Sequence, residues 1–149
     1  MSFIKTFIII VFLSTTFTSI QAQIGLTVYS FQGFGVQTSQ SNPISGELKV
    51  FANRPFEILL LELNGFYNFK PKEYHQFSLG LGINTTPFLS AEAGTIAVLV
   101  PLQLTVFPLQ DFKRLSLVFE LAPVVSLDTI EWSHLRAFWG FRYYFSVDE

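Results

Sequence analysis

The chain has 149 residues, of which 50% are hydrophobic, 17% aromatic and 13% charged, and its formal net charge is −2. A soluble domain typically has about 25% charged residues, so this composition favours a protein that meets an apolar environment. The absence of cysteine excludes a disulfide framework and a lipid anchor on an N-terminal cysteine. No basic tract is present, which argues against nucleic acid as a partner, and the length favours a single domain.

The N-terminal segment is typical of an export signal. Met1–Lys5 carries one positive charge, Phe7–Leu13 is an uninterrupted apolar run, and Ala22 provides a small residue for cleavage. The apolar run is shorter than the roughly 20 residues that a membrane-spanning helix requires. We therefore expect a cleaved signal peptide at residues 1–22 and one β-barrel domain at residues 23–149.

The rest of the sequence divides into apolar segments that end at turn-forming clusters. We expect strands at Ile24–Val36, Ser45–Asn53, Phe56–Phe69, Gln76–Pro87, Thr95–Phe107, Arg114–Val125 and His134–Phe145. The first segment changes its alternation midway, and a bulge near Ser30 with a bend at Gly33 and Gly35 would explain this. These are seven strands, whereas bacterial single-chain barrels have even numbers, so we expect an eighth strand within Thr85–Leu99 or Val124–Trp132.

From Gln76 to Phe145 every charge inside these segments falls on one side of a period-two alternation, and the other side is apolar. Successive side chains of a strand point to opposite faces, and a transmembrane barrel turns the apolar face to lipid. An arginine facing lipid near the midplane costs about 2–4 kcal/mol, which favours placing the charges inside. We expect six of them to form a structural ion-pair network in the lumen: Glu47, Lys49, Glu62, Glu120, Arg136 and Arg142.

Strand length also favours a bilayer. The expected strands have about 9–14 residues, whereas a tilted membrane strand needs about 9–11 and the mean strand of globular proteins has about 5–6. We therefore predict an all-β fold, a closed antiparallel up-and-down transmembrane β-barrel of about eight strands. The interior of such a barrel is filled by side chains, so we expect no open pore.

Residues suited to catalysis are scarce. His75 and His134 are the only histidines, and Ser133 and His134 are consecutive, so their side chains face opposite sides of a strand. That geometry does not suit a Ser–His nucleophile. Two isolated histidines and scattered acids lack the spacing of a metal site. We therefore expect no enzymatic activity, no catalytic residue, no cofactor and no metal.

The last predicted strand carries a recognisable pattern. Its outward positions are aromatic: Trp139, Phe141, Tyr143 and Phe145. The stretch Gly140–Phe145 resembles the closing strand of small bacterial outer-membrane β-barrel proteins of the OmpA-membrane-domain or OmpX type, although four residues follow the final aromatic here. The resemblance implies an insertion signal that the barrel-assembly machinery reads, and it implies a structural or surface role without a catalytic residue.

Three functions follow as hypotheses. The first is a small, monomeric, non-enzymatic barrel in the outer membrane of a Gram-negative cell, with envelope lipid as its main partner. The second is a soluble periplasmic or secreted barrel that binds an apolar ligand. In that case the apolar face would line the interior, and the charged face would be exposed to solvent. The third is a barrel-embedded lipid-modifying enzyme that uses His134 and Ser133. Extraction behaviour separates the first two, and substitution of His134 and Ser133 tests the third.

Overall fold

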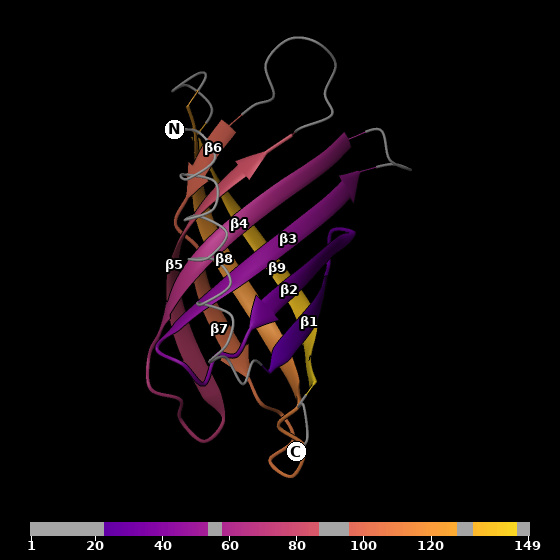
Figure 1. Ribbon diagram of the computed structural model, residues 1–149, viewed down its shortest axis with the longest axis vertical. Coiled ribbons are helices and arrows are strands. Elements are labelled where there is room, and N and C mark those ends of the chain that lie inside the picture. The colour runs from indigo at the N-terminus through magenta and orange to yellow at the C-terminus, as the bar shows by residue number, and fades with distance from the viewer. Residues whose placement is uncertain (1–22, 54–57, 87–95, 128–132, 146–149) are drawn as a thin grey trace, which may run out of the picture.

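The computed structural model describes residues 23–53, 58–86, 96–127 and 133–145, which form one closed sheet (Figure 1). The expected signal peptide, residues 1–22, lies outside the described residues. Within the described part of the chain, no helix is long and apolar enough to cross a membrane.

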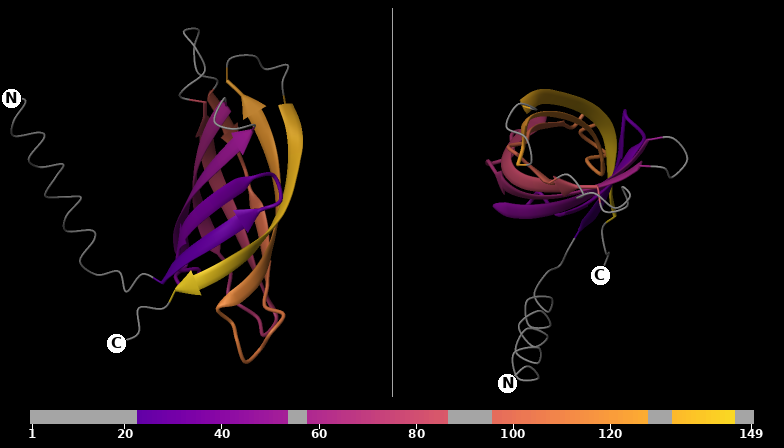
Figure 2. Two further views of the ribbon diagram at one scale, coloured as in Figure 1. Left: turned by 90° about the vertical axis from the view of Figure 1, so that its right-hand side faces the viewer. Right: turned by 90° about the horizontal axis from the view of Figure 1, so that it is seen from above.

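All described secondary structure consists of strands and turns. The strands are β1 (Ile24–Tyr29), β2 (Gly33–Thr38), β3 (Ile44–Asn53), β4 (Ile58–Asn68), β5 (His75–Thr85), β6 (Ile96–Leu99), β7 (Leu102–Val106), β8 (Leu115–Ser126) and β9 (Ser133–Phe145). Pairing is antiparallel between strands that follow each other around the barrel, and β9 pairs with β1 to close it (Figure 2). β6 and β7 both lie between β5 and β8 and share one place in the order of strands around the barrel. The nine strands therefore occupy eight strand positions. The predicted closed, antiparallel barrel of about eight strands is confirmed.

The eighth barrel position comes from a region that the sequence analysis assigned to one strand. The expected strand Ile24–Val36 is a hairpin, in which a three-residue turn joins β1 to β2. Gln32 closes this turn with a φ of 48°, so the chain reverses there. The alternation changes because the chain turns back, and the predicted bulge near Ser30 and bend at Gly33 and Gly35 are wrong. The expectation of an eighth strand within Thr85–Leu99 or Val124–Trp132 is also wrong, since the described parts of these ranges add no further barrel position. The predicted strand Thr95–Phe107 is divided into β6 and β7, and the predicted boundaries Phe56, Pro87 and Thr95 lie outside the described residues. The remaining boundaries of the other predicted strands agree with the prediction to within one residue.

The break between β6 and β7 does not open the wall. Pro101 has no N–H to donate, which interrupts the regular ladder. Its carbonyl oxygen still accepts a hydrogen bond from the Gly80 amide at 2.8 Å, and the Val100 amide donates to the Pro123 carbonyl at 3.2 Å. The two segments therefore occupy a single strand position in the barrel. Their side chains alternate between the inside and the outside without a break, as the sequence predicted.

Polar and apolar residues are distributed in the reverse of the usual soluble pattern. The buried polar and charged side chains include Glu47, Lys49, Glu62, Gln103, Glu120 and Arg142. Large apolar side chains on every barrel position are exposed on the outer wall, with Leu81 at 68% and Leu135 at 66%. Among the described strands, every Asp, Glu, Lys and Arg points into the barrel. The remaining described charges lie in the loops that join the strands.

Candidate functional site

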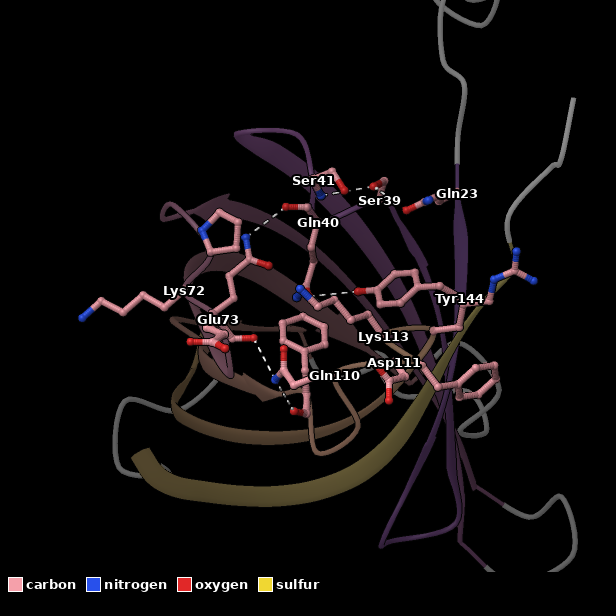
Figure 3. A pocket seen from close by; sticks show the side chains of 15 residues that line it. Gln23, Ser39, Gln40, Ser41, Lys72, Glu73, Gln110, Asp111, Lys113 and Tyr144 are labelled. Carbon is pink, nitrogen blue, oxygen red and sulfur yellow. Dashed lines mark hydrogen bonds between the residues drawn. The ribbon is translucent and has the colours of Figure 1, made fainter.

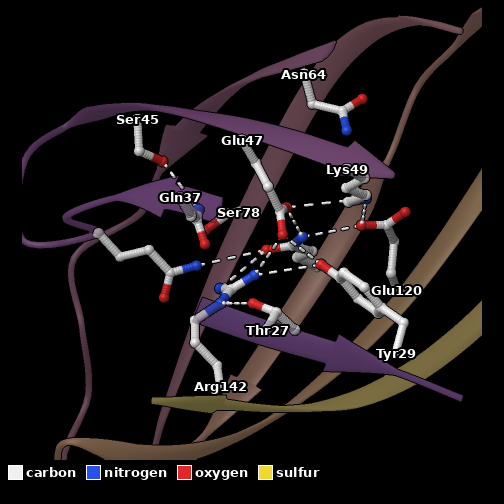
Figure 4. Close-up of polar contacts among 12 residues, drawn as sticks. Thr27, Tyr29, Gln37, Ser45, Glu47, Lys49, Asn64, Ser78, Glu120 and Arg142 are labelled. Carbon is white, nitrogen blue, oxygen red and sulfur yellow. Dashed lines mark hydrogen bonds and ion pairs between the residues drawn. The ribbon is translucent and has the colours of Figure 1, made fainter. Parts of the chain in front are cut away.

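The centre of the barrel interior is organised around Lys49 of β3 (Figure 4). Its Nζ lies 3.1 Å from Glu62 Oε1 and 3.8 Å from Glu47 Oε2, and it also contacts Glu120 Oε2. All four side chains are fully buried. Lys49 and Glu62 are direct cross-strand partners of β3 and β4, whereas Glu120 comes from β8 on another side of the barrel. One ammonium group thus holds three carboxylates from three strands.

Arg136 of β9 completes this group from the end of the barrel where β9 begins. Its Nη1 and Nη2 donate to the two oxygens of Glu62 at 2.6 and 2.9 Å, and Nη2 also donates to Glu120 at 3.2 Å. The paired geometry with Glu62 is the bidentate arrangement that makes guanidinium–carboxylate contacts strong and directional. The guanidinium also lies 4.4 Å from the ring centroid of Phe138.

Arg142 of β9 forms the other half of the interior network. Its Nη2 donates to Glu47 Oε1 at 3.0 Å, and its Nε donates to the Thr27 hydroxyl at 2.7 Å. The hydroxyl of Tyr29 donates to the same Glu47 oxygen. Glu47 therefore receives hydrogen bonds from groups on β1 and β9, which lie on the far side of β2 from its own strand.

Gln103 of β7 joins the two halves. Its side-chain Nε2 donates to Glu47 Oε2 at 2.8 Å and to Glu120 Oε2 at 2.9 Å. The sequence pattern singles out only the six charged residues, and it does not predict the part that Gln103, Tyr29 and Thr27 play. Their inward position in the alternation was the only available signal, and it does not reveal which neutral polar groups meet the charges.

The network brings together all six charged residues that the sequence singled out. Three carboxylates meet three cations, and each of the six makes at least one ion pair. Removing one partner from such a group leaves an uncompensated buried charge, which is strongly destabilising. The arrangement holds opposite walls of the barrel together. Five of its six charged side chains are fully buried, and that of Arg136 is 13% exposed.

Small residues make room for this network. An ideal Cβ at Gly35 would lie 2.7 Å from Glu47 Oε1 and 3.0 Å from the Tyr29 ring. A Cβ at Gly140 would lie 2.5 Å from the carbonyl oxygen of Val28 and 3.2 Å from the Tyr29 ring. These glycines allow the tyrosine ring to lie against the wall, so that its hydroxyl reaches Glu47.

At the end of the barrel where β1 begins and β9 ends, the barrel mouth holds a polar pocket of about 580 Å³ (Figure 3). Four residues that line it are buried: Ser39, Gln40, Gln76 and Tyr144. The Tyr144 hydroxyl donates to Gln40 Oε1 at 2.9 Å, and Gln76 Nε2 donates to the Gln40 carbonyl at 3.0 Å. The Gln40 side chain also reaches Gln103 at 3.5 Å. The segment between β2 and β3 thus folds into the mouth and separates the pocket from the charged centre.

At the opposite end, aromatic rings gather on the side of the barrel formed by β9, β1 and β3. β1 and β2 have six residues each, whereas β3 has 10 and β9 has 13. Beside the short hairpin, the Phe138 ring centroid lies 5.0 Å from that of Phe51, 5.6 Å from Phe31 and 6.0 Å from Tyr29. Arg136 packs beneath this cluster. The charged centre therefore lies between an amide-rich plug and this group of rings, the aromatic cap.

The two histidines lie apart from each other and from the charged centre. His134 is exposed near the start of β9, and the side chain of Ser133 lies outside the described residues. His75 is partly buried at the start of β5, with its ring edge-on to Phe77 at 5.6 Å. Within the described chain, no three His, Cys, Asp or Glu residues are grouped so that they could hold a metal ion.

The four aromatic residues of the closing strand lie on the outer wall. Trp139, Phe141 and Phe145 are about half exposed, and Tyr143 is partly exposed. Trp139 packs edge-on against Phe141 at 5.8 Å, and Tyr143 packs against Phe145 at 4.9 Å. This strand pairs with β8 and β1, so it closes the barrel.

Fold and interior together define a closed eight-position β-barrel with a packed, charge-balanced polar core. Comparison of the chain with models of protein families, with curated proteins and with solved structures finds no match. Its function must therefore be inferred from the barrel itself.

Proposed function

We propose that this protein is a small outer-membrane β-barrel with a structural or surface-interaction role, and that it does not form an open pore. The observation that carries the proposal is the inverted distribution of residues. The described strands place every charged side chain inside and a continuous apolar surface outside. A soluble monomer rarely exposes a contiguous apolar patch larger than a few hundred Å², whereas a lipid-facing wall requires one.

The aromatic side chains support the same proposal. Exposed rings gather at the end of the barrel where β1 begins and β9 ends: Tyr67, Phe69, Tyr74, Phe77, Phe112 and Phe145. Aromatic residues form girdles where a barrel wall passes from hydrocarbon to head groups. In this proposal the ring of aromatics marks one membrane boundary, and the charged loops beside it lie in the head-group region and in water.

The packed interior supports a closed barrel. The largest fully buried side chains are Arg142, Lys49, Phe66, Leu99, Gln37 and Gln103. An eight-stranded barrel has just enough interior volume for its own side chains. The ion-pair network, the amide plug and the aromatic cap occupy successive levels of this space, so no continuous water path is expected.

The proposal extends to export and insertion. Residues 1–22 would direct the chain across the inner membrane and be removed. The aromatic closing strand would then serve as the signal for the barrel-assembly machinery. Outer-membrane lipid is the proposed permanent partner, and the closed barrel requires no second copy.

Fractionation tests the proposal directly. The full chain, expressed in a Gram-negative host, should be found in the outer-membrane fraction and should require detergent for extraction. Unheated samples should migrate faster in gels than boiled samples, because a folded barrel resists the denaturing detergent. Release by osmotic shock as a folded, surfactant-free monomer would refute the proposal and favour the soluble apolar-ligand binder.

A further inference from the structure

The outer wall carries a groove that the charged centre does not use. It lies at the end of the barrel where β1 begins and β9 ends, has a volume of about 400 Å³, and is lined by Phe69, Lys70, Lys72, His75, Phe77 and Leu102. That volume falls within the range of small-molecule sites, about 300–1,000 Å³. The groove lies on the outer face, on the wall formed by β4, β5 and β7.

One part of the groove is apolar and rigidly built. The Phe69 amide donates to the Phe77 carbonyl at 3.0 Å, which fixes the two phenylalanines on adjacent strands. Leu102 extends the same surface onto β7. All three side chains are between 43% and 48% exposed, so each offers an uncovered apolar face.

The loop end of the groove is cationic. Lys70 and Lys72 are exposed on the loop between β4 and β5, and His75 begins β5. The Lys72 amide donates to the His75 carbonyl at 2.9 Å, which holds the loop in a tight turn over the groove. No acidic side chain is among the described residues that line it. Glu73 lines the polar mouth pocket, which Lys72 borders as well.

We propose that this groove binds one anionic phospholipid. The phosphate lies between Lys70 and Lys72 with His75 beside it, and the first part of an acyl chain lies along Phe69, Phe77 and Leu102. The groove has the same order of groups as a phospholipid. Its cations lie at the aromatic boundary, where a head group would be, and its apolar lining continues along the wall, where an acyl chain would be. The inference rests on the proposed membrane location, because an acyl chain is available to this surface only in a bilayer.

Lipid binding by the purified barrel tests the proposal. The protein in non-ionic detergent is titrated with dioleoylphosphatidylglycerol or with dioleoylphosphatidylcholine, and native mass spectrometry counts the lipids retained. We expect one phosphatidylglycerol to bind about tenfold more tightly than phosphatidylcholine, from two lysines near an anionic head group. Equal retention of the two lipids would overturn the proposal, as would displacement of the lipid by inorganic phosphate at the same concentration.

Matched variants locate the site. Lys70→Gln with Lys72→Gln should abolish the preference for phosphatidylglycerol, whereas Lys113→Gln, at the same end but outside the groove, should retain it. Phe77→Ala should weaken retention, whereas Phe119→Ala, which is equally exposed on the outer face of β8, should not. A preference that survives the double lysine change would contradict the proposal.

The two proposals fail in different ways. A detergent-dependent barrel that does not distinguish the two lipids leaves the outer-membrane proposal standing and refutes the groove. A chain that is folded and monomeric without surfactant refutes both.

Discussion

Lys49 is the residue on which the interior charge balance depends most directly, because its ammonium contacts Glu47, Glu62 and Glu120. Lys49→Met leaves one negative charge in excess in the buried centre. We expect it to lower the free energy of unfolding by about 3–5 kcal/mol. A urea titration in detergent micelles, followed by tryptophan fluorescence, measures the change.

The double variant Lys49→Met with Glu120→Gln tests whether charge balance is the cause. It restores interior neutrality, so more than half of the lost stability should return. Lys70→Met, in an exposed loop, serves as the control and should change stability by less than about 0.5 kcal/mol. Equal losses for the single and double variants would show that packing, and not charge, dominates at this position.

Two glycines in the wall provide a matched pair. An ideal Cβ at Gly140 would lie 2.5 Å from the Val28 carbonyl oxygen, whereas a Cβ at Gly65 meets nothing within 4 Å. Gly140→Ala should therefore cost about 1–3 kcal/mol, because backbone must move. Gly65→Ala, which faces outward, should be neutral or slightly stabilising. The same urea titration measures both, and similar effects at the two positions would contradict the interior arrangement described for Tyr29.

At the scale of the element, the β1–β2 hairpin depends on the backbone conformation of Gln32. Its φ of 48° lies in the left-handed region, which costs roughly 1–2 kcal/mol for an L-residue other than glycine. Gln32→Gly should therefore raise the thermal midpoint of unfolding. Lys113→Gly, in a loop where no positive φ is found, should lower it through greater freedom of the unfolded chain. A lower midpoint for Gln32→Gly would mean that the turn is not formed as described.

At the scale of the whole molecule, a single substitution can test whether the apolar outer wall faces lipid or water. Leu81 lies near the middle of β5 on the outer wall and is 68% exposed. In a bilayer, Leu81→Arg should cost about 2–4 kcal/mol and reduce the folded, heat-modifiable form. Leu109→Arg, in the loop between β7 and β8, should have little effect. If both changes leave folding intact and improve solubility, the wall faces water.

A second test concerns the closed lumen. If the ion-pair network, the amide plug and the aromatic cap block the lumen as proposed, purified barrel added to a planar lipid bilayer should give no stepwise current. A stable ohmic conductance from the wild-type chain would refute the proposal that the lumen is blocked. It would not bear on the outward direction of the apolar side chains.

The strand positions and the inward or outward direction of nearly every strand residue could be predicted from the sequence. Alternation is a local property, since the pleat of a strand sends neighbouring side chains to opposite faces whatever the fold. The same locality explains the failure at residues 30–32. A reversal of the chain and a bulge both change the alternation, and only pairing with a neighbouring strand distinguishes them.

Sequence alone therefore determined that charges and hydrocarbon would be separated onto two faces of long strands. Tertiary structure decided which charges meet. Lys49 and Glu120 are 71 residues apart, and Arg136 and Glu62 are 74 apart. They come together because the closure of β9 onto β1 makes a cylinder so narrow that side chains from different walls touch. The alternation within one strand gives no information about contacts between residues so far apart in the sequence.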